Sequence, residues 1–253
     1  MRGSVVIVGG GVMGAATACF LARDHGVAVT VFERDPLYRR ASSALSASSI
    51  RQQFSQGINS ALSQGSLRFL QRVGDELAVG SERPHTGLVE PGYLYVVTEA
   101  GRGVLCENQV VQRAHGADVT LLTVPQLQQR FPWLHCDDLT LELESLRLRS
   151  AWAGYYEMNT FDHDGRAGAL PDLSNVFTAC GFSGHGMQQA PAVGSAMAAL
   201  IANGASKRCE QAVLAGGASR RCEQAVLAGS ASRQCEQAVR ATLRGWMRCR
   251  RTG

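Results

Sequence analysis

An α/β fold is predicted by three segments that follow one another within residues 4–33. Residues 4–9, SVVIVG, form a continuous run of mainly β-branched residues, which is typical of a buried parallel strand. Residues 15–26, AATACFLARDHG, have the apolar spacing of a helix and end at a glycine, and residues 27–33, VAVTVFE, form a second strand-like run. A strand, a helix and a strand in this order predict a β-α-β unit with parallel strands.

The loop between the first strand and the helix carries the pattern G-x-G-x-x-G, in residues 9–14 (GGGVMG). Gly9 allows a tight turn, Gly11 lets the backbone approach a pyrophosphate, and Gly14 lets the helix pack closely on the strand. The N-terminus of the helix favours phosphates, and Glu33 at the end of the second strand can accept hydrogen bonds from ribose hydroxyls. We therefore predict a dinucleotide site rather than a ligand-free glycine-rich turn, although this motif alone does not choose between NAD and FAD.

Two further segments bear on that choice. Residues 41–55, ASSALSASSIRQQFS, combine small hydroxyl residues with a following IRQQ, and residues 175–202 read as a strand (NVFTAC), a turn (GFSGHG) and an apolar helix. With GGGVMG and FERD, these segments resemble the FAD-dependent D-amino-acid/sarcosine oxidase (DAO) family. The stretches SAWAGYY, NTFD, QQAP, GYLYVV and RFPWL are similar to one subgroup of that family, and the resemblance covers residues 4–138 and 146–202.

The resemblance implies an α/β architecture with a discontinuous, Rossmann-like FAD-binding domain formed by residues 1–80 and 146–204. It also implies a truncated α+β second domain over residues 81–138, the remnant of a substrate domain, with strands expected at GYLYVV and VTLLT and a helix at GRGVLCENQVVQRAHG. Between Trp133 and Trp152 lie only 18 residues, where the family has most of its substrate-domain sheet. Residues 205–253 contain three copies of a 13-residue unit and are expected to be a helical or disordered basic tail.

The resemblance also implies which residues bind FAD. These are Gly9, Gly10, Gly11, Val12, Met13, Gly14, Glu33, Arg34, Ser42, Ser43, Arg51, Gln52, Gly181, Ser183, Gly184, His185, Gly186, Met187 and Gln188. The FAD is expected to be non-covalent, because Gly154 stands where related oxidases carry a flavin-linking cysteine. Arg51, as the anchor of a substrate carboxylate, His185 and Tyr156 are the candidate catalytic residues.

The function that this resemblance implies is hydride transfer from the C–N carbon of an amino acid or N-methyl amino acid to the flavin. Gln188 replaces a basic residue that the related oxidases use near the flavin, and the shortened interval removes part of the pocket, so activity and substrate type stay open. The alternatives are a non-catalytic FAD-binding assembly factor for mitochondrial respiratory complex I, with which the subgroup is associated, and an inactive truncated product.

Charge and hydropathy limit the partners. Residues 1–204 hold 15 arginines against 18 acidic residues, a net charge of −3, whereas residues 205–253 hold 10 basic against 3 acidic residues, a net charge of +7. The basic balance therefore lies in the tail, and a nucleic-acid partner is not expected. No apolar run reaches the roughly 20 residues that span a bilayer. Met1-Arg2-Gly3-Ser4 leads directly into the first strand and leaves no room for a transit peptide, so either none is needed or the start is incomplete. The resemblance implies a mitochondrial location, and a cytoplasmic one is the alternative.

Overall fold

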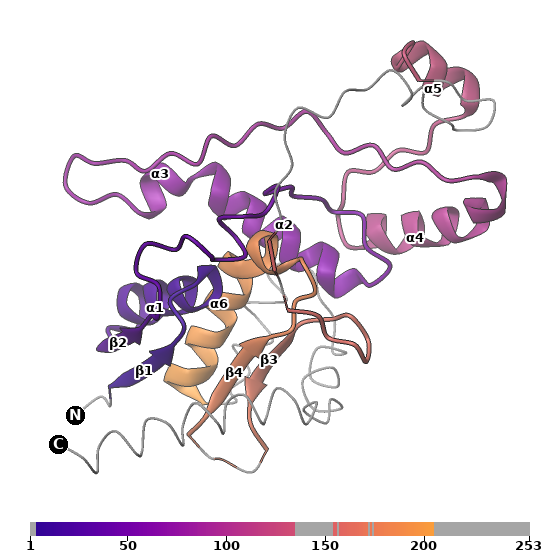
Figure 1. The fold of residues 1–253 in the computed structure, drawn as a ribbon. Coiled ribbons are helices and arrows are strands. Elements are labelled where there is room, and N and C mark those ends of the chain that lie inside the picture. Colours follow the sequence, from indigo (N-terminus) through magenta and orange to yellow (C-terminus); the bar gives the residue numbers. More distant parts are fainter. Residues whose placement is uncertain (1–3, 135–153, 156, 172, 174, 205–253) are drawn as a thin grey trace. The chain divides into compact units, whose positions relative to one another are not determined.

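The computed structural model describes residues 4–134, 154–155, 157–171, 173 and 175–204. These residues divide into two compact units, of which the first contains residues 4–48 and 154–204 and the second contains residues 49–134. Figure 1 colours the chain from indigo to orange, so that both ends of the described sequence can be followed into the first unit. The division at residue 48 differs from the expected boundary at residue 80, because the helix that begins at Gly57 packs within the second unit.

The first unit begins with the predicted β-α-β arrangement. Strand β1 (Val5–Val8) and strand β2 (Val29–Phe32) pair in parallel, with Val5 opposite Val29, and helix α1 (Val12–His25) connects them. Gly26 ends α1 in a left-handed conformation, with a φ of 60°, and its amide donates a hydrogen bond to the carbonyl oxygen of Ala22. The two strands and the helix predicted over residues 4–33 are therefore confirmed, with a Rossmann-like connection between parallel strands.

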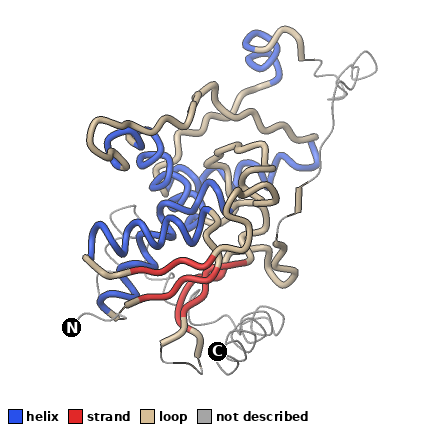
Figure 2. Tube along the Cα trace, turned by 60° about the vertical axis from the view of Figure 1, so that its left-hand side comes forward, coloured by secondary structure: helices blue, strands red, loops and turns tan. Residues whose placement is uncertain are grey.

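The second half of the first unit comes from the far end of the described chain. Strand β3 (Arg166–Ala169) pairs antiparallel with strand β4 (Phe177–Cys180), and helix α6 (Gly186–Asn203) follows β4 after a short turn. Figure 2 shows the strands of both pairs in red. The predicted strand at NVFTAC and the apolar helix after GFSGHG are confirmed as β4 and α6. Strand β3 was not predicted, because its sequence RAGA carries no run of β-branched residues.

Helices α1 and α6 pack against each other more extensively than any other two elements of the described chain. A Cβ atom added at Gly194 of α6 would lie 2.6 Å from the Cβ atom of Ala16 and 2.9 Å from the backbone nitrogen of Thr17. The two helix backbones therefore approach each other at a position where only glycine fits. Leu21 of α1 and Ala190 and Ala198 of α6 have no exposed surface, which places the core of the unit along this contact.

The second unit is built from helices and loops. Its elements are α2 (Gly57–Gln71), α3 (Val73–Glu76), the 3-10 turn η1 (Glu99–Gly101), α4 (Arg102–Ala114) and α5 (Val124–Arg130). The buried face of α2 carries three fully or nearly fully buried serines at positions 60, 63 and 66. The His115 ring fills the space beside Gly57, where a Cβ atom would overlap it, and Gln64 donates a hydrogen bond to the His115 carbonyl oxygen. These contacts join α2 to the end of α4.

Two predicted strands of the second unit are wrong. GYLYVV (residues 92–97) and VTLLT (residues 119–123) do not form strands, whereas the helix predicted between them is confirmed as α4. A strand needs a neighbour to pair with its N–H and C=O groups, and no other strand lies among residues 49–134. Tyr93, Leu94, Tyr95 and Val96 are accordingly exposed. The predicted tail at 205–253 and most of the short interval between Trp133 and Trp152 lie outside the described residues.

Apolar side chains are also exposed on the β1–β2 pair of the first unit. Val8 is 62% exposed and Phe32 is 51% exposed, although both sit in strands of the kind that sheets usually bury. The described residues thus leave part of this two-stranded sheet open to solvent. No helix in the described part of the chain has the length and apolar character needed to cross a membrane.

Candidate functional site

The loop between β1 and α1 has the geometry that a glycine-rich phosphate loop requires. Gly9 has a φ of 100°, which other residues rarely adopt, and its amide donates a hydrogen bond to the carbonyl oxygen of Phe32. A Cβ atom at Gly14 would overlap the carbonyl oxygen of Gly9 and lie 3.2 Å from the side chain of Ile7. Gly9 therefore turns the chain out of the strand, and Gly14 allows α1 to pack directly against that turn.

Gly11, unlike Gly14, borders open space, since nothing lies within 4 Å of the position that its Cβ atom would occupy. Gly11 is also the N-cap of α1, where no side chain caps the helix and the first turn carries no acidic residue. The N–H groups and the positive end of the helix dipole at Val12 and Met13 are therefore available to an anion. This open space beside an uncapped helix start fits the pyrophosphate of a dinucleotide.

Glu33 lies directly beside this loop, one residue after the end of β2. One carboxylate oxygen accepts a hydrogen bond of 2.7 Å from the amide of Gly10, and the other accepts one of 2.7 Å from the amide of Asp35. These backbone hydrogen bonds, that from Asp35 first, hold the pKa of the Glu33 carboxyl below its ordinary value of 4.5. Glu33 is therefore ionised at neutral pH and held in place. Each carboxylate oxygen still has a lone pair that can accept a hydrogen bond from a ribose hydroxyl.

The lowered pKa of Glu33 predicts a pH dependence confined to acid. Because ionised Glu33 makes these bonds only in the folded chain, their contribution to stability is complete above the unfolded pKa of about 4.5 and is lost as the pH falls through the lower, folded pKa. We expect the protection of the Gly10 and Asp35 amides from hydrogen exchange, relative to the intrinsic rate at each pH, to fall in that acidic window. The variant Glu33→Gln should lack this step, and an identical acid transition in both proteins would contradict the assignment.

Three other predicted FAD-binding residues follow Glu33 in the first unit. Arg34 is exposed immediately after it. The Ser42 hydroxyl donates a hydrogen bond of 2.6 Å to the carbonyl oxygen of Tyr155, and the Ser43 carbonyl oxygen accepts one of 3.0 Å from the Ser46 hydroxyl. The hydrogen bond from Ser42 to Tyr155 thus joins the serine-rich segment to the chain next to Gly154, although the two residues are 113 positions apart in the sequence.

A second glycine-containing turn precedes α6. Gly181, Ser183 and Gly184 all have positive φ values, of 73°, 49° and 84°, and the amide of His185 donates a hydrogen bond of 2.8 Å to the carbonyl oxygen of Phe182. Such a conformation is unusual for serine, so the surrounding contacts must hold it. The turn delivers the chain to Gly186, where α6 begins without a side-chain cap.

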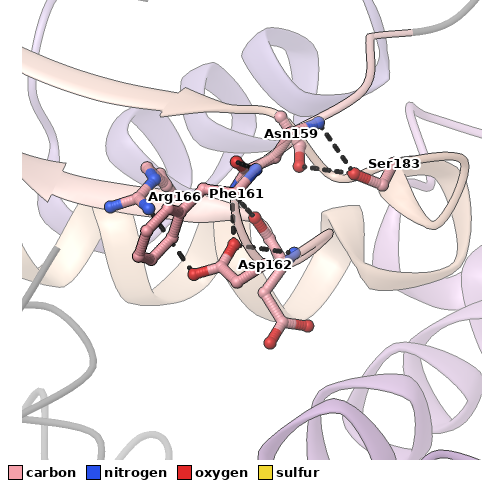
Figure 3. A network of polar contacts seen from close by, with 7 residues as sticks. Asn159, Phe161, Asp162, Arg166 and Ser183 are labelled. Carbon is pink, nitrogen blue, oxygen red and sulfur yellow. Dashed lines mark hydrogen bonds and ion pairs between the residues drawn. The ribbon is translucent and has the colours of Figure 1, made fainter. Parts of the chain in front are cut away.

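The contacts that hold this turn come from the NTFD segment (Figure 3). The Ser183 hydroxyl oxygen accepts a hydrogen bond of 3.0 Å from the amide of Asn159, and the hydroxyl donates to the carbonyl oxygen of Gly181. The buried Asn159 side chain donates in turn to Asp162 and to the carbonyl oxygen of Asp164, and Arg166 lies 3.5 Å from the Asp162 carboxylate. The sequence prediction did not assign a site role to Asn159 or Asp162.

Asn159→Ala is expected to loosen this turn. The change removes the buried amide that joins Asp162 to the carbonyl oxygen of Asp164, and the loss of buried hydrogen bonds of this kind costs about 1–3 kcal/mol. The free energy of unfolding of the first unit should fall by that amount, as measured by denaturant titration. His163→Asn, on an exposed neighbour whose φ of 60° suits asparagine, is the control and should change it by less than about 0.5 kcal/mol. An unchanged Asn159→Ala protein would rule out this supporting role.

His185 and Gln188 form a pair at the start of α6. Gln188 is 4% exposed, and its side-chain nitrogen lies 2.8 Å from Nδ1 of His185. Since an amide N–H donates, this contact fits a histidine that carries its proton on Nε2. Gly186, Met187 and Gln188 form the first turn of α6, so the predicted flavin segment from Gly181 to Gln188 is one continuous turn and helix start.

Arg51 and Gln52 belong to the second unit, whereas the other predicted site residues that the structure describes belong to the first. The Arg51 carbonyl oxygen accepts a hydrogen bond of 2.6 Å from Ser63, and that of Gln52 accepts one of 2.9 Å from Ser60. The Arg51 guanidinium lies 5.1 Å from the centre of the Phe54 ring. The buried serines of α2 therefore fix the backbone of this predicted FAD-binding segment. Tyr156, the third candidate catalytic residue, lies outside the described residues.

Comparison with known proteins agrees with this geometry. The family model described as FAD dependent oxidoreductase (DAO) matches residues 4–143 and 138–200. The chain belongs to this DAO family. The matched residues include the glycine loop, Glu33 and the turn before α6, which are the features that fit a bound dinucleotide. FAD, the cofactor of the family, is therefore consistent with the site.

Several curated proteins are similar to this DAO family chain. The chain is 40% identical over 165 residues to FAD-dependent oxidoreductase domain-containing protein 1 of Xenopus laevis, and the aligned part makes up 63% of this chain and 33% of the relative. The protein of the same name from Bos taurus is 41% identical over 145 residues, which are 55% of this chain and 30% of the relative. The homolog of that protein from Drosophila melanogaster is 30% identical over 128 residues, which are 50% of this chain and 24% of the relative. The chain thus spans about a third of the length of these relatives, and no solved structure matches it significantly.

Proposed function

We propose that this DAO family protein binds FAD without a covalent link and uses it to oxidise a small amine or amino acid. The observation that carries the proposal is the contrast within the glycine loop. Gly14 is closed against Gly9, whereas Gly11 opens onto unfilled space at the uncapped start of α1. A site with this shape, and with ionised Glu33 beside it, suits the pyrophosphate and ribose of the adenosine half of FAD.

The flavin half of the cofactor is assigned to the turn before α6. The N-terminus of α6 has no side-chain cap, so it can offer N–H groups and the positive end of its dipole to an anionic ring edge. Gly181, Ser183, Gly184, His185, Gly186, Met187 and Gln188 are the proposed contacts. Gly154 supports non-covalent binding, because it has no nucleophilic side chain and a Cβ atom there would lie 2.8 Å from that of Leu45. When bound, FAD supplies an acceptor for two electrons.

The proposed reaction is oxidation at a C–N bond, with hydride leaving the carbon that bears the nitrogen. Arg51 is proposed to bind a substrate carboxylate through its guanidinium, and His185 and Tyr156 are proposed to line the reaction site. The placement of the Arg51 guanidinium over the Phe54 ring supports this role, because the ring contact orients a planar group that can pair with a carboxylate through two N–H donors.

Spectroscopy of the purified full chain tests the proposal. After incubation with FAD and removal of unbound FAD, we expect the protein to keep a visible flavin spectrum. Acid precipitation should release the colour into the supernatant, and a substrate amine should bleach it under anaerobic conditions. Glu33→Ala should weaken FAD binding by about tenfold or more, because a charged hydrogen-bond partner of the ribose is lost. Colour that precipitates with the protein would contradict non-covalent binding, and tight binding of NAD in place of FAD would contradict the cofactor.

A second proposed function is that of a non-catalytic, FAD-stabilised assembly factor for respiratory complex I in mitochondria. The exposed apolar residues of the β1–β2 pair, among them Val8 and Phe32, favour it, because such surfaces commonly contact other proteins. In this case the protein should bind FAD without turning over any amine, fractionate with mitochondria and co-purify with complex I subunits. Bleaching of the flavin by an amine would favour the first function.

A further inference from the structure

Tyr38 occupies an unusual place beside the glycine loop. A Cβ atom built on buried Gly10 would lie 3.1 Å from the Tyr38 hydroxyl oxygen and 3.1 Å from the Cβ atom of Glu33. The tyrosine hydroxyl and the Glu33 side chain therefore converge on the same glycine. Within the part of the chain that the structure describes, the Tyr38 hydroxyl makes no hydrogen bond, and the residue is 41% exposed.

The chain from Glu33 to Ala41 is folded in a way that holds Tyr38 there. The Asp35 carboxylate accepts hydrogen bonds from the amides of Leu37 and Arg40, at 3.3 and 3.2 Å, and the Asp35 carbonyl oxygen accepts one of 2.9 Å from the amide of Tyr38. Glu33 in turn binds the amide of Asp35. One chain of contacts thus runs from the Glu33 carboxylate to the backbone of Tyr38.

Tyr38 has a φ of 53°, a left-handed conformation that is unfavourable for an aromatic residue. The turn around Asp35 compensates for this cost and returns the ring toward Gly10. An exposed tyrosine that only filled space would not need such a conformation. The combination of a strained backbone, an unpaired hydroxyl and the adjacent carboxylate is typical of a residue that contacts a ligand.

We propose that the Tyr38 hydroxyl is a binding residue for the adenosine ribose, acting together with the Glu33 carboxylate. The ligand class is any nucleotide with an adenosine diphosphate moiety and free ribose hydroxyls, so this inference rests on the proposed dinucleotide function. Glu33 accepts hydrogen bonds, whereas a tyrosine hydroxyl both donates and accepts. The pair therefore offers the ribose diol complementary partners that lie close together beside Gly10.

Titration of the full chain with ADP, 2′-deoxy-ADP and 3′-deoxy-ADP tests this proposal. Tyr38→Phe keeps the ring and removes only the hydroxyl, and it should weaken ADP binding about fivefold, the value of one neutral hydrogen bond. With the deoxy analogue that lacks the partner hydroxyl, the same substitution should cost less than about twofold. A residue with a merely structural role would weaken all three nucleotides equally.

Tyr155→Phe is the matched control, since Tyr155 belongs to the same unit and is 93% exposed. It should leave the affinity for all three nucleotides unchanged. Equal losses for the three nucleotides in Tyr38→Phe, or no loss for ADP, would overturn the role of Tyr38 while leaving nucleotide binding in place. Failure of the unsubstituted protein to bind either ADP or FAD would overturn the proposed function itself.

Discussion

Gly14→Ala should abolish FAD binding and lower the free energy of unfolding of the first unit by about 1–3 kcal/mol. The added methyl group would overlap the carbonyl oxygen of Gly9 and press on Ile7, so α1 must move away from β1. That movement also displaces the N–H groups at the start of α1 from the phosphate position. Denaturant titration would measure the loss of stability, and the flavin absorbance that stays with the protein after removal of unbound FAD would measure the loss of binding.

Gly11→Ala provides the matched control in the same loop. Its added methyl group has nothing within 4 Å and its φ of −58° suits alanine, so the stability of the free protein should hardly change. The methyl group would nevertheless project into the space assigned to the pyrophosphate, so FAD binding should still fall steeply. If Gly11→Ala bound FAD as well as the unsubstituted chain, the pyrophosphate would have to lie elsewhere.

Gly194→Ala is the second substitution for which we expect a large effect. Alanine normally stabilises a helix relative to glycine by about 1 kcal/mol. At this position its methyl group would lie 2.6 Å from that of Ala16 and 2.8 Å from the Ala16 backbone, so α1 and α6 would have to separate. Overpacking of this kind costs about 1–3 kcal/mol, so the net effect should be destabilising. Hydrogen exchange at the amides of α1 would detect the loosened contact.

Two further variants separate this packing effect from helix propensity. Gly103→Ala places the same change on α4, where nothing lies within 4 Å, and it should stabilise the protein by up to about 1 kcal/mol. Ala16→Gly combined with Gly194→Ala removes one of the two clashing methyl groups and should restore part of the lost stability. Stabilisation by Gly194→Ala alone would show that the two helices are less closely packed than described.

The parts of the site that the sequence predicts are those that a short segment encodes by itself. The β1–α1–β2 unit and the passage from β4 through the turn to α6 each follow from local apolar periodicity and glycine positions, and both are observed. Their hydrogen bonds and turn conformations depend on neighbours within a few residues. Glycine at positions 9, 11 and 14 could therefore be interpreted residue by residue.

Features that depend on distant partners were not predictable in the same way. The segment at residues 92–97 has the composition of a strand but lacks a pairing strand among residues 49–134, so composition alone gave the wrong prediction. Ser60 and Ser63 of α2 lie on a face that polarity would place in solvent, and their hydrogen bonds to the carbonyl oxygens of residues 52 and 51 explain the burial. Asn159 likewise gains its role from Ser183, which lies beyond two strands.

The contact between Ala16 and Gly194 also determines when the first unit can fold during translation. The ribosome must add 178 residues after Ala16 before Gly194 exists. At typical elongation rates of about 5–20 residues per second, that wait lasts roughly 9–36 s. During this time α1 is present without α6, and the face of α1 that α6 later covers is open to solvent. The nascent chain therefore carries this face of α1 uncovered early in its synthesis, and the contact between α1 and α6 forms only after α6 has emerged.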